Sequence, residues 1–277
     1  MVEVNRDVMN RQTAPSTAPA RPGVRLYRVR VTDRRQLSPN MIRVSLGGDD
    51  LRDFVAVGPD QRVKLILPRD GETSPNVSPD MTPKDILALP ESDRPVMRTY
   101  TIRLHRADDN EVDIDFATHG PGGGPASAWA QTCDPGSEVA LFGPISAYAP
   151  SEMSVPQLIA GDETALPAIG AILEQLPPEA HADVVVEIPT AADAQEIRSD
   201  ATVRTRWLAR DEAGARPGEL LPDALASMAR DRTYGYAWLA CESSTAQRLR
   251  RHVVEDLGLD KGQVYFSGYW KIGHVLG

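Results

Sequence analysis

The period of the hydrophobic pattern changes once along this chain, near Pro150, and that change constrains the fold more than any other feature. Over residues 24–142 apolar and polar residues alternate, as they do at Ile42, Val44 and Leu46. A period of two is typical of strands that bury one face. After Pro150 short apolar runs alternate with helical segments, which indicates a parallel sheet covered by helices. A chain of 277 residues with such a change predicts two domains.

The predicted boundaries follow from this pattern. Residues 1–22 are polar and proline-rich without apolar periodicity, which predicts a disordered tail. Residues 23–150 predict an antiparallel β-barrel, because turn-forming residues separate the half-buried strands and the one strong helical pattern begins at Pro125. Residues 151–277 predict an α/β domain with a parallel sheet. Its predicted strands are 156–160, 184–188, 203–208, 236–241 and 264–266, and its predicted helices are 164–176, 222–230 and 245–257.

The sequence also indicates where two helices begin or end, and it contains one irregular segment. Ser244 and Gln247 fit a capping box for the last helix, and Gly258 is placed to end it. Thr164 is a candidate cap for the first helix of the second domain. Residues 74–93, rich in Pro, Ser and Asp, fit either an ordered lid or a disordered insertion.

The charge and the cysteines exclude several classes of partner. A formal net charge of -9 opposes non-specific attraction to nucleic acid. Cys133 and Cys241 have no second cysteine or histidine at metal-ligand spacing, so neither a metal site nor a structural disulfide is expected. No apolar run approaches the ~20 residues that cross a bilayer, and the N-terminus lacks the apolar stretch of a signal peptide. We expect a cytoplasmic protein with no membrane span.

The stretch Arg98, Thr99, Tyr100 and Thr101 lies on a predicted strand. It supplies a permanent cation, an aromatic plane and a short hydroxyl, which are the groups that a flavin nucleotide needs. Alternation places Arg98 and Tyr100 on one face and the two threonines on the other. An ordinary half-exposed strand would carry the same residues, so both interpretations stay open here.

A second stretch, HGPGGGPASAWA, runs from His119 to Ala130. A strand ends there in a glycine-rich loop, and the loop opens a helix with Pro125 at its first position. Glycines allow close approach to a ligand and the start of a helix attracts phosphate, while Ser127 adds a hydroxyl. The stretch matches neither GxGxxG nor GxxxxGK. A flexible hairpin with a buried Trp129 is the alternative.

Together these motifs resemble a known family. RTYT, DFATHG, GPASAWA and a strand closing at LFGP resemble the flavin domain of the siderophore-interacting protein family, a branch of the ferredoxin reductase superfamily. The resemblance continues through AGDETALPAI and YFSGYW and spans roughly residues 24–273. It implies a ferredoxin reductase-like fold, in which an N-terminal antiparallel β-barrel binds FAD and a parallel-sheet α/β domain binds a nicotinamide nucleotide.

The resemblance also implies which residues hold the cofactors. Tyr100 would lie beside the isoalloxazine, and Arg98 would lie toward the phosphates. His119 would contact FAD, although a lone histidine at a strand end is often only structural. The implied FAD set is Arg98, Thr99, Tyr100, Thr101, His119, Gly120, Pro125, Ala126, Ser127 and Trp129, and the implied nicotinamide nucleotide set is Asp162, Thr164 and Ala165.

Substrate residues are implied in the same way. A ferric siderophore is often anionic, so an acidic protein must supply local positive charge to hold it. Lys64 resembles the family's basic residue at the substrate mouth, and Lys271 falls where relatives commonly carry one; solvated surface lysines are the alternative for both. Relatives often carry Arg where Ile145 stands here, which suggests a different or less anionic siderophore.

The implied activity is that of an FAD-dependent ferric-siderophore reductase. Electrons would pass from NAD(P)H, either NADH or NADPH, or from reduced ferredoxin, through FAD to Fe(III), and iron would leave as Fe(II). This chemistry needs no catalytic side chain and no metal held by the protein. The alternatives are a siderophore-binding protein without reductase activity and a general flavin reductase. The protein is expected to be a monomer. Its expected partners are a ferric siderophore and an electron donor.

Overall fold

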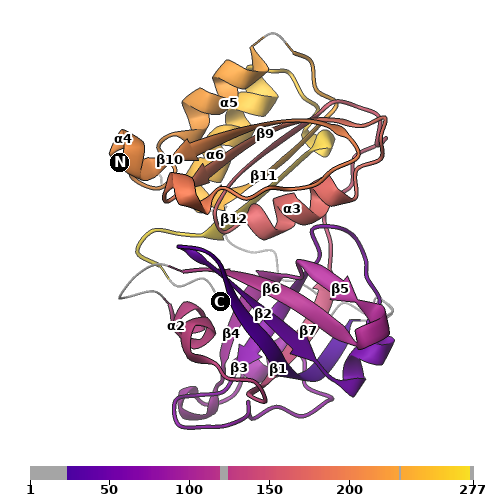
Figure 1. The fold of residues 1–277 in the computed structure, drawn as a ribbon, viewed down its shortest axis with the longest axis vertical. Coiled ribbons are helices and arrows are strands. Elements are labelled where there is room, and N and C mark those ends of the chain that lie inside the picture. The colour runs from indigo at the N-terminus through magenta and orange to yellow at the C-terminus, as the bar shows by residue number, and fades with distance from the viewer. Residues whose placement is uncertain (1–23, 119–123, 231, 275–277) are drawn as a thin grey trace, which may run out of the picture.

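The computed structural model describes residues 24–118, 124–230 and 232–274, which form two sheets, one above the other in Figure 1. The first sheet is antiparallel, in the order β4-β3-β7-β1-β2-β6-β5. Its strands are β1 (Arg25–Ser38), β2 (Met41–Gly47), β3 (Arg62–Leu67), β4 (Val96–Thr101), β5 (Leu104–Arg106), β6 (Glu111–Ala117) and β7 (Glu138–Ile145).

This sheet curls toward a barrel because of how its end strands connect, although no strand pair among the described residues closes it. β4 and β5 stand at opposite ends of the strand order, yet only Ile102 and Arg103 separate them in sequence. The chain therefore brings the two ends of the sheet together. Tyr100 of β4 accordingly contacts Phe116 of β6, with ring centroids 4.4 Å apart. The antiparallel first domain is confirmed.

The second sheet is wholly parallel, in the order β10-β9-β8-β11-β12. Helix α3 lies on the side toward the barrel, and α5 and α6 cover the other side (Figure 1). The predicted α/β domain is thus confirmed. The strands are β8 (Gln157–Asp162), β9 (His181–Ile188), β10 (Thr202–Ala209), β11 (Tyr236–Glu242) and β12 (Val264–Trp270). The helices of both domains are α1 (Pro83–Leu87), α2 (Pro125–Thr132), α3 (Leu166–Glu174), α4 (Arg210–Ala213), α5 (Leu221–Ala229) and α6 (Ser243–Glu255).

The polar face of β2 is buried, so the prediction of a half-buried strand is wrong there. Arg43 is only 8% exposed, and its Nε lies 2.6 Å from Asp115 on β6. Arg103, just before β5, forms an ion pair with Glu174 at the end of α3. The second domain therefore covers this side of the barrel. A polar side chain remains there because each charge has a partner of opposite sign.

The start of α6 also differs from the prediction. Glu242 is the cap, and its carboxylate accepts hydrogen bonds from the backbone N–H groups of Ser244 and Thr245. The expected capping box of Ser244 with Gln247 does not form. A carboxylate at the end of β11 is already directed at these amides, and a negative charge is favoured at a helix start. Gly258 has a φ of 74°, as expected of a residue that ends a helix.

The segment between β3 and β4 packs against the barrel. Thr82 and Asp85 form a reciprocal capping box at the start of α1. Val77 and Ile86 are buried against the outer face of the first sheet. Arg28 of β1 donates a hydrogen bond to the carbonyl oxygen of Val77 at 2.6 Å. Of the two possibilities for residues 74–93, the structure therefore shows an ordered segment.

Gly161 in β8 has no room for a side chain. A Cβ there would lie 2.7 Å from the Cβ of Ala165 and 2.7 Å from the carbonyl oxygen of Ala240. We expect Gly161→Ala to lower the free energy of unfolding by roughly 1–3 kcal/mol, because the added methyl group forces packed backbone apart. Urea unfolding without FAD measures the change. Gly124→Ala, whose Cβ would meet no atom within 4 Å, is the matched control, and equal midpoints for the two variants would contradict the prediction.

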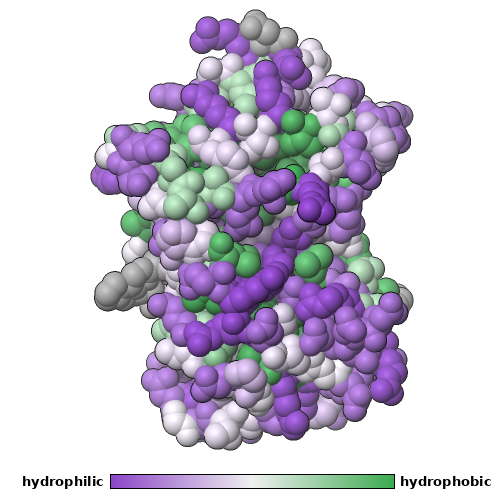
Figure 2. Space-filling view, viewed as in Figure 1, coloured by the Kyte–Doolittle hydropathy of each residue, from purple (hydrophilic) through white to green (hydrophobic). Residues whose placement is uncertain are grey.

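The face of the molecule in Figure 2 is mainly hydrophilic, with apolar residues scattered over it. Scattered apolar residues are normal on a protein surface and do not by themselves mark an interface. Within residues 24–118, 124–230 and 232–274, no helix is long and apolar enough to cross a membrane.

Candidate functional site

An aromatic wall stands where β4, β6 and α2 meet. The ring of Tyr100 lies 4.4 Å from that of Phe116, which in turn lies 5.8 Å from that of Trp129. Tyr100 and Trp129 remain partly exposed, whereas Phe116 is buried. Burial raises the pKa of Tyr100 to about 12, so its hydroxyl stays protonated at neutral pH. The wall therefore presents two partly exposed, uncharged rings.

The start of α2 lies beside this wall. Gly124 is the N-cap and Pro125 is the first helical residue, as predicted. No side chain caps this end among the residues described, and the space around Gly124 is open. Because the first N–H groups of a helix have no partner within it, those after Gly124 suit an anion. Ser127 is buried within this first turn, and His119 and Gly120 lie outside the described residues.

Positive charge gathers on β3 and β4. The guanidinium of Arg98 donates to the carbonyl oxygen of Met97 at 2.7 Å. Within the described parts of the chain, neither Arg98 nor Lys64 has an ion-pair partner within 4.0 Å. Burial lowers the pKa of Lys64, and the charges of Arg62 and Arg98 lower it further. Such a group of cations favours an anionic ligand.

Strand alternation separates the predicted residues into two sets. Arg98 stands directly opposite Leu65 of the barrel core, on the same face as Tyr100. Thr99 stands opposite Lys64, and cross-strand partners point to the same face, so these two share the outer face. Thr101, which ends β4, is 6% exposed. The predicted flavin residues Arg98 and Tyr100 thus share the inner face of β4, whereas Thr99 lies on the outer face with Lys64.

A carboxylate that the sequence analysis missed joins the two domains. Asp60 is 0% exposed, and one of its oxygens accepts hydrogen bonds from the backbone N–H groups of Ala147 at 2.9 Å and Tyr148 at 3.0 Å. Its other oxygen accepts from the indole N–H of Trp238 on β11 at 3.2 Å. No sequence pattern marks Asp60, because Trp238 follows it by 178 residues.

Asp162 and Glu242 end β8 and β11, two neighbouring strands where the strand order reverses. Open α/β domains bind ligands at this point, beyond the carboxyl ends of the strands. Asp162 accepts hydrogen bonds from the N–H groups of Thr164 at 3.0 Å, Glu242 at 2.9 Å and the Trp270 indole at 2.8 Å. Thr164 is therefore not the cap of α3; the cap position is Ala165, which is 0% exposed.

Comparisons with known proteins agree with this architecture. Residues 30–148 match the family model of the siderophore-interacting FAD-binding domain, and residues 156–273 match that of the siderophore-interacting protein. The chain is 30% identical over 240 residues to the ferric vibriobactin reductase ViuB of Vibrio cholerae, covering 87% of both chains. The chain belongs to the siderophore-interacting protein family. The resemblance stated from the sequence is thereby confirmed.

Solved structures support the same family. The siderophore-interacting protein SipS of Aeromonas hydrophila is 31% identical and aligns with a TM-score of 0.74, over 92% of this chain and 94% of that one. A siderophore utilization protein from T. fusca is 28% identical, with a TM-score of 0.76, over 91% and 95%. The ferredoxin reductase in carbazole 1,9a-dioxygenase, at 18% identity and a TM-score of 0.66, covers 91% of this chain and 71% of that one, and shares the fold.

The residues around β4 and α2 fit the FAD that this family model names. Partly exposed aromatic rings, an arginine without an acidic partner and a helix start without a side-chain cap, all judged among the described residues, are what a flavin and its diphosphate require. A Cβ at Gly124 would meet no atom of the described residues within 4 Å, so these residues leave the backbone accessible there. No group of three or more metal-ligating side chains occurs in the described ranges.

Arg210 and Lys271 are charged residues of the second domain, one buried and one exposed. Arg210 is 8% exposed and donates two hydrogen bonds of 2.7 Å to Glu163 and one of 3.3 Å to Glu187. Lys271 follows β12 and is exposed, with a backbone bridge to His274. Lys271 and Lys64 belong to different domains, and within the described residues no hydrogen bond or ion pair joins them.

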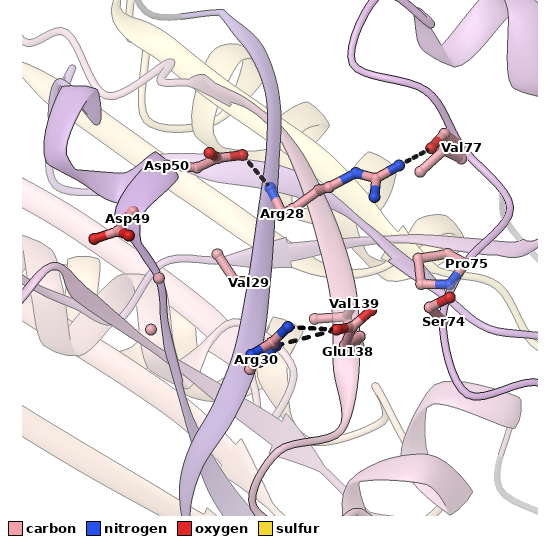
Figure 3. A pocket seen from close by; sticks show the side chains of 12 residues that line it. Arg28, Val29, Arg30, Asp49, Asp50, Ser74, Pro75, Val77, Glu138 and Val139 are labelled. Atoms are coloured by element: carbon pink, nitrogen blue, oxygen red, sulfur yellow. Dashed lines mark hydrogen bonds and ion pairs between the residues drawn. The ribbon is translucent and has the colours of Figure 1, made fainter.

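A cavity of about 480 Å³ lies on the barrel beside β1 (Figure 3). Its walls carry charges of both signs, and these charges contact one another. Arg30 lies 2.8 Å from Glu138, and the backbone N–H of Arg28 donates to Asp50 at 2.8 Å. Because the charged groups on its walls already contact one another, this cavity offers a ligand fewer unpaired charges than the residues around β4 do.

Asp162 should make stability depend on pH. Burial, and then the neighbouring Glu163 carboxylate, raise its pKa to about 7. The folded protein then holds a proton that the unfolded chain releases, so this residue's contribution to stability falls as pH rises from about 4 to about 7. Between pH 5 and pH 8 the difference in unfolding free energy between Asp162→Asn and wild type should shift by about 2 kcal/mol in favour of the variant, because an amide does not titrate. The amide also leaves one of the surrounding N–H donors unsatisfied, so only this pH-dependent shift, measured by urea unfolding, and not the absolute stability, reports the carboxyl group. Exposed Asp108→Asn is the control, and a pH-independent difference for Asp162→Asn would contradict the assignment.

Proposed function

We propose that this protein is an FAD-dependent ferric-siderophore reductase, and hence an oxidoreductase. The observation that carries the proposal is the meeting of the aromatic wall, Arg98 and the start of α2, which no described side chain caps, at one side of a barrel that matches a siderophore-interacting FAD-binding domain. The Vibrio cholerae relative is named as a ferric vibriobactin reductase, which supports the same activity here.

FAD would be held mainly from the first domain. Tyr100 would face the isoalloxazine, while Arg98 and the first turn of α2 would hold the diphosphate. When bound, FAD supplies the conversion between a two-electron donor and a one-electron acceptor. The remaining residues proposed to contact it are Thr101, His119, Gly120, Pro125, Ala126, Ser127 and Trp129, with Thr99 beside them on the outer face.

The electron donor would approach the second domain. We place NAD(P)H at the carboxyl ends of β8 and β11, near Asp162, Thr164 and Ala165, because this is the switch point of a parallel sheet. Reduced ferredoxin is the alternative donor. The substrate, a ferric siderophore, would meet Lys64 and Lys271, gain one electron and release iron as Fe(II), which binds hard oxygen ligands more weakly.

These roles assign one cofactor or donor to each domain. We assign residues 23–150 to FAD and residues 151–277 to the nucleotide, since the antiparallel sheet ends before residue 150 and the parallel sheet begins after it. We further propose a monomer in the cytoplasm, where NADH, NADPH and ferredoxin are available.

An anaerobic spectral titration tests the function. Protein purified with FAD should be yellow, lose its visible flavin absorption with NADH, NADPH or reduced ferredoxin, and regain it when a ferric siderophore is added. Protein that stays colourless after incubation with FAD would rule out the proposal. Binding of the chelate without FAD would favour a siderophore-binding protein, and equal turnover with free flavins would favour a general flavin reductase.

A further inference from the structure

The outer face of β3 is covered at both ends and open between them. At one end Ile66 is buried under the segment that precedes β4. At the other end Arg62 meets Tyr265 of β12. Lys64 lies between these covers and is half-buried. We call the open part the cation strip, and it consists of Arg62 and Lys64 on β3, Thr99 on β4 and Ile145 on β7.

Arg62 is held in place by an aromatic pair. Its Nη1 donates to the hydroxyl of Tyr265 at 3.0 Å, and its guanidinium carbon lies 5.9 Å from the centroid of that ring. The Tyr265 ring stacks on Trp238 at 5.8 Å, and Trp238 is fully buried. The guanidinium is thus fixed at the domain junction, and within the described parts of the chain its other N–H groups have no acceptor and remain for a ligand.

The cations of the strip have no ion-pair partner among the described residues. Among the residues described, none of the acidic side chains lies within 4.0 Å of Arg62 or Lys64. Asp60 is near in sequence, but its carboxylate is directed at Ala147, Tyr148 and Trp238 and forms no ion pair with either cation.

This imbalance has an energetic consequence. Burial lowers the pKa of Lys64, and repulsion from Arg62 and Arg98 acts in the same direction. Like charges held together without a counter-charge cost energy that a bound anion would remove. In a protein of net charge -9, such a local excess of cations favours an anionic ligand.

Ile145 adds an apolar group to the cation strip. It is 39% exposed and pairs with Arg62 across β3 and β7. Residues that pair across antiparallel strands present their side chains to the same face. A ligand held by Arg62 would therefore also contact an alkyl surface.

We propose that Arg62 binds substrate and that, with Lys64, it selects a ferric chelate that carries net negative charge. This inference rests on the proposed function. A guanidinium can hold two oxygens of a carboxylate or catecholate at once, and Lys64 adds a point charge beside it. Arg62 thereby supplies the positive charge that the sequence analysis found missing at Ile145. The chelate's organic backbone rests on Ile145.

Binding of two oxidised chelates tests the proposal. Fe(III) tris-catecholate carries three negative charges, and Fe(III) tris-hydroxamate is neutral. Quenching of tryptophan fluorescence, without any reductant, measures their affinities. We expect Arg62→Gln to weaken binding of the catecholate chelate about 10-fold and that of the hydroxamate chelate less than about 2-fold. Added salt should narrow the wild-type preference for the charged chelate.

Matched variants separate binding from a structural role. Tyr265→Phe removes the hydrogen bond to Arg62 but keeps the cation, so the preference for charge should persist. Arg62→Lys should restore most of the affinity that Arg62→Gln loses, and Arg35→Ala on an exposed part of β1 should change nothing. Thermal melting establishes that each variant is folded.

Two results would overturn the inference: unchanged catecholate binding by Arg62→Gln, or equal losses for both chelates. The proposed function is tested separately, because these measurements need neither FAD nor an electron donor. A protein that shows the charge preference but never binds FAD would refute the reductase alone. A working reductase whose Arg62→Gln variant ignores chelate charge would refute only the role of Arg62.

Discussion

Arg98→Ala is expected to weaken the binding of FAD by about 10- to 100-fold. Hydrogen bonds between a charged donor and phosphate are worth about 1.5–3 kcal/mol each, which corresponds to this range of affinity. The only acceptor found for the Arg98 guanidinium in the described structure is the carbonyl oxygen of Met97, so most of its N–H groups remain for a diphosphate. Titration of the apoprotein with FAD, followed by flavin fluorescence, measures the dissociation constant.

Two further variants make this result specific. Arg98→Lys keeps the charge but not the two-pronged donor, so its affinity should lie between wild type and Arg98→Ala. Arg30→Ala removes an exposed arginine that pairs with Glu138 elsewhere on the barrel, and FAD binding should be unchanged. Should Arg98→Ala bind FAD as tightly as wild type, the diphosphate would have to lie away from β4, and the proposed FAD site would fail.

Much of the fold was predictable because its signals are local. The alternation around Val44 and the apolar run at Val184–Val186 each reflect burial of one face or of both faces of a strand. Pro125 marks the first turn of α2 because its missing N–H costs nothing there. These features depend on neighbours within a few residues, and the printed sequence contains those neighbours.

Other features depend on partners that are distant in sequence. The buried face of β2 exists because the second domain covers it, and no pattern around Arg43 reveals that cover. The cap of α6 is Glu242 because the end of β11 positions its carboxylate, although Ser244 fits the local rule better. Local signals thus predicted the elements, while contacts between domains decided which polar groups are buried.

The candidate site shows the same division. The motif around Arg98 and Tyr100 predicted a flavin face, and strand alternation predicted that Thr99 points elsewhere; the structure has both features. No sequence motif marks Arg62, because its position depends on Tyr265, which follows it by 203 residues. The second domain therefore helps to build the face that we assign to substrate.

Asp60→Asn is expected to lower the free energy of unfolding by about 2–4 kcal/mol, the largest stability effect that we predict. The carboxylate has only acceptor oxygens, and they receive the N–H groups of Ala147, Tyr148 and Trp238. An amide in its place would direct its own N–H group at one of these donors and leave that donor unsatisfied inside the protein. Since Trp238 belongs to β11, the loss should loosen the contact between the two domains.

Urea unfolding of Asp60→Asn measures this loss, and near-ultraviolet circular dichroism reports the packing of the aromatic residues at the junction. Asp53→Asn is the matched control, because its side chain is 74% exposed, and it should change stability by less than about 0.5 kcal/mol. If Asp60→Asn unfolds at the same urea concentration as wild type, the hydrogen bond from Trp238 to Asp60 does not hold the domains together. Asp60 accepts a hydrogen bond from Trp238, and Trp238 stacks on the Tyr265 ring that contacts Arg62. Without a contribution from Asp60, another contact would have to hold Tyr265 and Arg62 in place.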